Sequence, residues 1–174
     1  MLNIFKPTWT LKRIYNLSVT QCQQNNIKAI LTDLDNTLIA WNNPNGTQEL
    51  HEWLDEMQTA GIQVIVVSNN NHERVKKALD NFNLDFISSA HKPLANKIKQ
   101  KIKSLKLTNN EVVIVGDQLL TDILAGHLAY VKSILVKPLI TSDKWMTKIN
   151  RFFEKIIYRI WNLTGFKINW QDKI

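Results

Sequence analysis

The sequence predicts an α/β fold in which a parallel sheet is wound on both faces by helices. Short apolar runs rich in Val and Ile alternate along the chain with longer segments whose apolar side chains recur at helical spacing. The runs are almost uninterrupted by polar residues, which is typical of strands buried on both faces. Alternating units of this length indicate parallel strands joined by helical crossovers.

The strands are expected near residues 28–33, 62–67, 85–88, 112–115 and 132–136. The helices are expected near residues 47–60, 72–82, 93–105, 118–129 and 143–162. Gly61 is a stop signal for the first of these helices, and Pro93 suits the first turn of the third, where its missing N–H costs little. Residues 1–25 form a polar lead-in with no clear pattern, and 174 residues suffice for one compact domain over 1–174.

Each of the first four predicted strands is followed by a side chain that can do chemistry. In chain order these are Asp33 and Asp35, Ser68, Lys92, and Asp117 with Asp122. Ligands of open α/β sheets bind at the carboxyl ends of the strands, so these groups should converge on one crevice. Carboxylates that lie close together repel one another unless a cation or a shared proton relieves them, which indicates a metal site or acid–base chemistry. Taken alone, the Asp-x-Asp-Asn segment could also be an ordinary loop.

These four segments resemble the four motifs of the haloacid dehalogenase (HAD) superfamily of phosphotransferases. Asp33-Leu34-Asp35-Asn36-Thr37 is similar to its D-x-D-x-T motif, and Ser68, Lys92 and the run from Asp117 to Asp122 are similar to the other three. The resemblance covers residues 28–136. Within the superfamily the chain resembles the small YqeG-like phosphatases of subfamily IIIA, which are related to the phosphatidylglycerophosphate phosphatases. This closer match depends on the first motif with Trp41, on Ser68-Asn69-Asn70, and on residues 116–122.

The resemblance implies a magnesium-dependent phosphomonoester hydrolase that works through an aspartyl-phosphate. Asp33 would be the nucleophile and Asp35 the general acid and base. Ser68 would hydrogen-bond the phosphoryl group, with Asn69 as a further substrate contact, and Lys92 would balance negative charge. The Mg²⁺ ligands would be the Asp33 carboxylate, the Asp35 backbone carbonyl and Asp117.

Further implications concern the supporting residues and the substrate. Asp122 would support the metal through water or orient Lys92. At least one of the asparagines 69–71 should cap the next helix, and Trp41 could be a substrate platform or a packed anchor. The substrate would be a phosphorylated compound, phosphatidylglycerophosphate if the closer match holds. The connections after Asp35 and before Asp117 have room for one helix each, so the fold should be capless, with an open crevice.

The composition of the chain indicates which partners it could bind and in which cellular compartment it works. The formal charge is +7, with six lysines and no acid over 92–106, so the partner could be nucleic acid, a membrane surface or a phosphorylated substrate. A single cysteine, Cys22, excludes an internal disulfide framework and fits a reducing compartment. No signal peptide and no apolar run of about 18 residues is present, so we expect a cytoplasmic protein, or one peripheral on the inner face of the membrane.

Residues 144–162 are expected to form a basic amphipathic helix. Its apolar side chains are Trp145, Met146, Ile149, Phe152, Phe153, Ile156, Ile157, Ile160 and Trp161. Its opposite face has Lys144, Lys148, Arg151, Lys155 and Arg159. The apolar stripe could pack on the sheet, on a partner chain, or in an anionic membrane interface. In the membrane alternative, reversing the charges of Lys148, Arg151 and Lys155 should weaken vesicle binding and leave activity on a soluble substrate intact.

Two other functions use the same residues differently. A non-enzymatic module could bind RNA or a protein partner through the basic surface, but a pure binder gains nothing from four repelling carboxylates. The acid set therefore disfavours a nucleic-acid partner. A receiver-like phosphoacceptor also groups acids, a hydroxyl and a lysine around Mg²⁺, but it lacks a second Asp at the spacing of Asp35.

Overall fold

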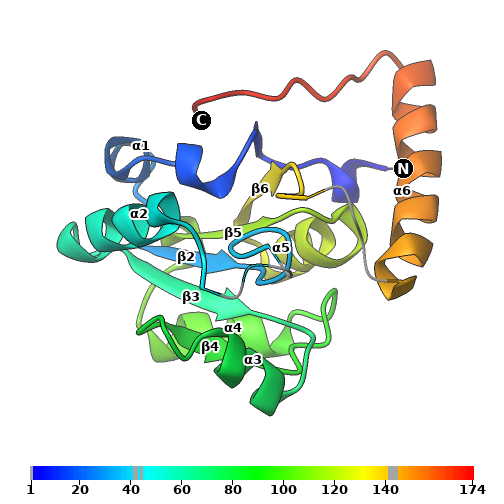
Figure 1. Cartoon of the computed structure of the whole chain (residues 1–174). Helices are drawn as coiled ribbons and strands as arrows, with labels where there is room; N and C mark the ends of the chain where they lie inside the picture. Colours follow the sequence, from blue (N-terminus) through cyan, green and yellow to red (C-terminus); the bar gives the residue numbers. More distant parts are fainter. Residues whose placement is uncertain (1, 41–42, 44, 141–144) are drawn as a thin grey trace.

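A six-stranded parallel sheet forms the centre of the protein, as seen in a computed structural model of the chain (Figure 1). The structure describes all residues except 1, 41–42, 44 and 141–144, and for residues 145–149 it describes the backbone only. The strand order is β1-β6-β5-β2-β3-β4. The strands are β1 (Trp9–Leu11), β2 (Ala29–Thr32), β3 (Gln63–Val67), β4 (Asp85–Ile87), β5 (Val112–Gly116) and β6 (Lys132–Val136). The predicted doubly wound α/β fold is confirmed.

Helices cover both faces of this sheet. They are α1 (Val19–Gln24), α2 (Gln48–Thr59), α3 (His72–Ala78), α4 (Asn96–Ser104), α5 (Leu124–Ala129) and α6 (Trp145–Leu163). Side chains of β2 alternate between the faces: Ile30 packs with the α1–α3 side and Leu31 with the α4–α5 side. Among the described residues, α2 is the one helix between Asp35 and β3, and α4 with a 3₁₀ turn lies between β4 and β5. The fold is therefore capless, as predicted.

Residues 2–25 contain more secondary structure than the sequence suggested. They contain the edge strand β1, which pairs with β6 so that Trp9 lies beside Ile134, and α1, which Ser18 and Gln21 cap reciprocally. The C-terminal segment returns to the free edge of β1, where Lys12 N–H donates to the Gln171 carbonyl at 3.0 Å (Figure 1). Pairing by the tail covers an edge that would otherwise present unpaired backbone groups.

Two predicted helix boundaries were wrong for local reasons. Helix α4 begins at Asn96, so Pro93 lies in the preceding turn and not in the first helical turn. The backbone of Lys92 is held by hydrogen bonds to the Asn69 side chain, which keeps this segment out of a helix. Helix α3 ends at Ala78, and the chain then turns so that Phe82 packs into the core.

The expected helix over 118–129 begins as a π-helical turn, η4 (Leu119–Ile123), and continues as α5.

Helix α6 packs its inner side against η4 and β6 and leaves its outer side exposed. Ile157 and Trp161 are buried with Leu119, Ile123 and Leu135. The stripe expected from the sequence is thus divided, because Phe152, Phe153, Ile156 and Ile160 are exposed on the same helix. No helix in the described part of the chain is long and apolar enough to cross a bilayer.

Candidate active site

The predicted polar groups meet at the carboxyl edge of the sheet. Asp33 and Asp35 follow β2, Ser68 follows β3, and Asp117 follows β5. One oxygen atom from each of Asp33, Asp117 and Asp122 lies within 4.8 Å of the other two. Three hard oxygen donors at this separation can contact one divalent ion of the Mg²⁺ type. The convergence expected from parallel strands is therefore present.

Lys92 is the buried centre of this cluster. Its ammonium donates to Asp33 Oδ1 and to Asp122 Oδ1, both at 2.7 Å, and its side chain is 2% exposed. Burial alone would lower the pKa of Lys92, but Asp122 and Asp33 together raise that pKa above its usual value. Lys92 is thus charged, and it neutralises part of the repulsion between two acids.

Asn69 and Asp122 both hold Lys92 in place. The Asn69 side chain accepts from the Lys92 N–H (2.6 Å) and donates to the Lys92 carbonyl (3.0 Å). Asp122 Oδ2 accepts the Gln118 N–H at 3.2 Å while its other oxygen binds Lys92. This contact with Lys92 is compatible with one of the two roles expected for Asp122, the orientation of Lys92, and both roles stay predictions. The contact of Asn69 with substrate stays a prediction.

The Asp35 carboxylate has an arginine partner that sequence reasoning missed. Arg74 Nη2 donates to both carboxylate oxygens, at 2.8 and 3.1 Å, and Asn70 Nδ2 donates to one of them at 2.9 Å. Asn71 caps α3 by accepting the Arg74 N–H, which confirms a capping asparagine here. The signal was available in the sequence, because the first turn of the helix after Ser68 must lie at the same edge of the sheet. The position of Trp41 falls outside the described residues.

Asp117 is paired with an arginine from the C-terminal helix. Arg151 Nη2 forms an ion pair with Asp117 Oδ2, and Arg151 Nη1 donates to the Asp117 carbonyl at 2.8 Å. Thr37 Oγ1 lies 3.5 Å from Asp117 Oδ1. The assignment of Arg151 to an outward basic face was therefore wrong, because its guanidinium points into the acid cluster. Reversing its charge would not leave the site intact.

Burial dominates the electrostatics of the two acids nearest the candidate metal position. Desolvation raises the pKa of Asp33 to about 6, although Lys92 opposes this shift. Desolvation raises the pKa of Asp117 to about 8, and here Arg151 opposes the shift. A bound cation would stabilise the charged form of such carboxylates, so their raised pKa values are consistent with a cation site.

Comparisons with known proteins agree with this arrangement. A family model described as "Haloacid dehalogenase-like hydrolase" matches residues 8–136. The chain belongs to the haloacid dehalogenase-like hydrolase family. The Bacillus subtilis protein named "Probable phosphatase YqeG" is 38% identical over 168 residues, which are 97% of each chain. The expected resemblance to YqeG-like phosphatases is therefore confirmed, and the HAD chain is a phosphatase rather than a non-enzymatic module.

Two solved structures are similar to this chain in fold. An uncharacterized protein from Listeria monocytogenes serotype 4b aligns with a TM-score of 0.53 at 19% identity, covering 68% of this chain and 84% of that one. A hypothetical protein from Xanthomonas campestris aligns with a TM-score of 0.51 at 13% identity, covering 75% and 72%. At these identities the likeness concerns the fold alone.

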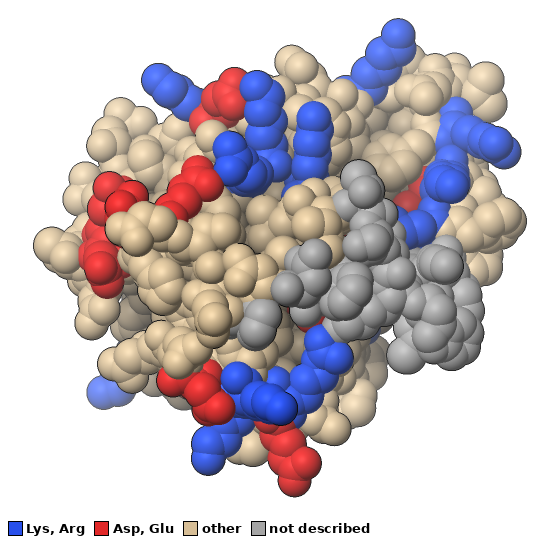
Figure 2. Space-filling view, in the orientation of Figure 1, with Lys and Arg blue, Asp and Glu red and all other residues tan. Residues whose placement is uncertain are grey.

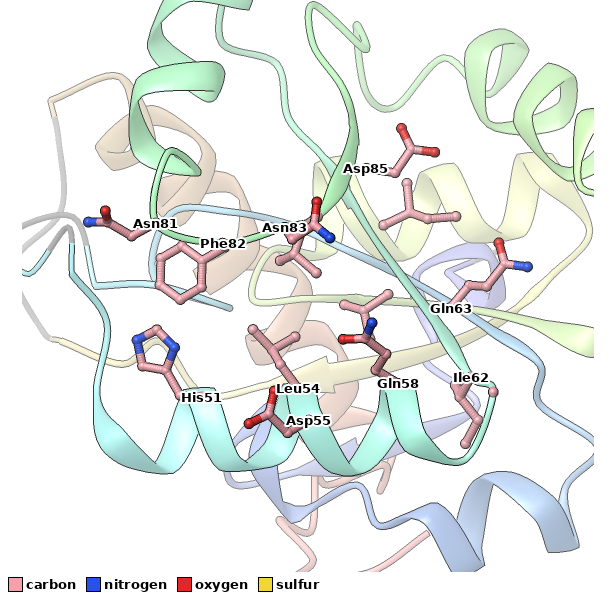
Figure 3. A pocket seen from close by; sticks show the side chains of 14 residues that line it. His51, Leu54, Asp55, Gln58, Ile62, Gln63, Asn81, Phe82, Asn83 and Asp85 are labelled. Carbon is pink, nitrogen blue, oxygen red and sulfur yellow. The ribbon is translucent and has the colours of Figure 1, made fainter.

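A separate pocket lies away from the acid cluster, between α2 and the first residues of β3 and β4 (Figure 3). It has a volume of about 390 Å³ and includes Leu54, Phe82 and Gln63 in its lining. His51 at its rim stacks on Phe82, with ring centroids 4.9 Å apart. Gln63 begins β3 and Ser68 follows its end, so the pocket and the acid cluster lie at opposite edges of the sheet. The pocket is thus distinct from the candidate active site.

Proposed function

We propose that the protein hydrolyses a phosphomonoester through a phosphorylated Asp33. The observation that carries the proposal is Lys92, which is buried between Asp33 and Asp122 at the point where three carboxylates converge. Burying a lysine costs free energy unless acids compensate its charge, and here the two acids hold the ammonium where the charge of a transferring phosphoryl group would develop. Ser68 is positioned by the Asn70 amide at 3.0 Å and would donate to a phosphoryl oxygen.

The reaction would proceed in two balanced steps. A carboxylate oxygen of Asp33 attacks phosphorus, the bond from phosphorus to the leaving oxygen breaks, and Asp35 gives that oxygen a proton. A water molecule then gives a proton to Asp35 and attacks the phosphorus of the aspartyl-phosphate, which releases phosphate and restores Asp33. Asp35 is ion-paired with Arg74, whose side chain is 42% exposed, so the guanidinium has room to move from Asp35 to the substrate.

The donor set fits Mg²⁺, which we propose as the cofactor. Asp33 and Asp117, two of the three acids that converge, would hold it together with the backbone carbonyl of Asp35, and each of these groups offers oxygen. When bound, the ion would reduce the repulsion between the Asp33 carboxylate and the phosphate dianion. The two cations Lys92 and Arg151 do not fully neutralise the three acids of the cluster. The remaining negative charge is consistent with a site for a further cation.

The substrate proposal is a lipid phosphate, phosphatidylglycerophosphate, held at an anionic membrane surface. The described residues place no cap over the acid cluster, and α6 beside it exposes Phe152 (61%), Ile156, Ile160 and Leu163 (88%) along one face. Lys155 and Arg159 flank this face, and Figure 2 shows basic side chains gathered on α6. An apolar face with basic flanks suits an interfacial helix, and each basic residue adds about 1 kcal/mol near an anionic surface.

Phosphate release tests the catalytic proposal. Wild type and Asp33→Asn would be compared with Mg²⁺ or EDTA, on phosphatidylglycerophosphate in mixed micelles and on p-nitrophenyl phosphate. We expect release by wild type with Mg²⁺, a preference for the lipid, and none from the variant. Equal trace release by both proteins would contradict the proposal, and a preference for the soluble ester would contradict only the lipid substrate.

Vesicle sedimentation tests the membrane part separately. Phe152→Ser with Ile156→Ser, and Lys155→Glu with Arg159→Glu, should each reduce binding to anionic vesicles at low salt. Activity on the soluble ester should stay at the wild-type level, because none of these side chains contacts the acid cluster. Lys97→Glu on α4 removes the same kind of charge elsewhere and is the control. Wild type that ignores anionic vesicles at low salt would refute the membrane surface.

A further inference from the structure

Helix α6 lies outside the matched HAD segment, yet it holds the loop that contains Asp117. The family model ends at residue 136 and α6 begins at Trp145. Three of its side chains reach residues 117–120. Arg151 binds the Asp117 carboxylate and carbonyl, and Asn150 Nδ2 donates to Gln118 Oε1 at 3.0 Å. Glu154 makes the third link and is the most buried of the three.

Glu154 completes the start of η4 from outside that element. Its Oε1 accepts the Leu119 N–H at 2.6 Å and the Leu120 N–H at 3.4 Å. The first N–H groups of a helical turn have no partner within the turn, and Gln118 supplies no side-chain cap here. Glu154 therefore caps this turn, and it holds the backbone that directly follows Asp117.

Glu154 and Arg151 also hold each other. Arg151 Nη1 donates to Glu154 Oε2 at 3.0 Å, and the Glu154 side chain is 1% exposed. A buried carboxylate costs several kcal/mol unless charge and hydrogen bonds compensate it. Packing alone would not require these polar groups, because Ile157 and Trp161 already anchor α6 in the core. The arrangement points to a role toward Asp117 that apolar residues could not supply.

We propose that Arg151 and Glu154 are positioning residues that fix Asp117 for metal binding. The inference rests on the proposed function, in which Asp117 is a Mg²⁺ ligand. Arg151 engages Oδ2 and the carbonyl of Asp117, so the residue is held at two points. Orientation of a ligand before the ion arrives raises affinity, and loss of such an outer partner typically weakens metal binding by about 10–100-fold. The metal affinity of the HAD core is thus set in part by a helix outside it.

Calorimetric titration of the full chain with Mg²⁺ tests this inference. Arg151→Gln should weaken Mg²⁺ binding by about 10–100-fold. Glu154→Gln should weaken it by less, because the amide oxygen can still accept the Leu119 N–H but offers no charge to Arg151. Arg151→Lys should lie between wild type and Arg151→Gln, since an ammonium keeps the charge and lacks the planar fork. Arg159→Gln, which removes an exposed cation from the same helix, is the matched control and should bind as wild type does.

Melting temperatures without metal separate positioning from a purely structural role. Each variant would be melted in EDTA and titrated below its own melting temperature, so that only folded protein is compared. Unchanged affinity in folded Arg151→Gln would make α6 structural and overturn the inference. Tighter binding would also overturn it, because Arg151 would then compete with the ion. If wild type binds no Mg²⁺ at all, the proposed metal site fails, which is a different outcome.

Discussion

Replacing Lys92 by Met should destabilise the protein strongly and in a pH-dependent way. The substitution keeps an unbranched side chain, one atom shorter, and removes its charge from between Asp33 and Asp122. Removing one partner of a buried ion pair costs about 3–5 kcal/mol, because the remaining charge is left uncompensated. For a chain of this size 1 kcal/mol lowers the melting temperature by about 2–4 °C, so we expect a decrease of about 6–20 °C in EDTA at pH 8.

The pH dependence follows from the raised pKa of Asp33. Burial already raises that pKa to about 6 with Lys92 present, and it rises further once Lys92 is gone. A carboxyl whose folded pKa lies above its unfolded value favours folding in its protonated form, and this contribution is lost as pH rises through the folded pKa. Below about pH 6 Asp33 is protonated in both proteins, so the deficit that remains there comes from the lost pair with Asp122. The deficit of the variant should therefore increase as the pH rises above 6 and be largest near pH 8.

Thermal melts of both proteins from pH 5 to pH 8, followed by circular dichroism in EDTA, measure this effect. Lys101→Met is the control, because Lys101 pairs with the exposed Asp85 and such surface pairs contribute less than about 1 kcal/mol. A deficit for Lys92→Met that is no larger than that of Lys101→Met would refute the account of the acid cluster. A deficit that is the same at every pH would refute the assignment to Asp33.

Three further substitutions test other parts of the site. Asp35→Asn should lower turnover of a soluble phosphomonoester by about 10²–10⁴-fold and keep the Mg²⁺-induced rise in melting temperature, since its side chain moves a proton and is not assigned to the metal; wild-type turnover would mean that the role is misassigned. Gly116→Ala should abolish turnover and cost about 1–3 kcal/mol, because the new Cβ would overlap the Asp122 side chain and push it from Lys92; an active variant with the wild-type melting temperature would show that Asp122 can shift harmlessly. Asp117→Asn should melt in EDTA at pH 8 at or above the wild-type temperature, because burial raises the pKa of Asp117 to about 8 and ionisation there opposes folding, and it should lose the Mg²⁺-induced rise; a much lower melting temperature in EDTA would make Asp117 a structural residue.

The convergence of the acids could be predicted from the sequence because it depends on strand direction alone. Parallel strands place their carboxyl ends at one edge, so Asp33, Ser68 and Asp117 had to lie together once the strands were assigned. The edge strand β1 could not be predicted in this way. Three residues give no periodicity, and the strand exists because β6 and the tail at Gln171 pair with it.

The role of α6 could not be predicted, because its polar residues have the same spacing whether they face solvent or face the active site. Arg151 and Glu154 are three residues apart, a spacing that on a solvated helix is an ordinary surface ion pair. Only the packing of Ile157 and Trp161 turns this pair toward Asp117. The sequence predicted the helix and its apolar stripe, but the direction of each face is set by contacts with a loop far away in the chain.

The phosphorylated state of Asp33 tests the central claim most directly. Wild type mixed with Mg²⁺ and a phosphomonoester would be quenched in acid within one turnover, and the protein would be digested and analysed by mass spectrometry. We predict one added phosphoryl group on the peptide that contains Asp33, present only with Mg²⁺ and absent from Asp33→Asn. Phosphorylation of another residue, or turnover by Asp33→Asn at the wild-type rate, would contradict the proposed mechanism.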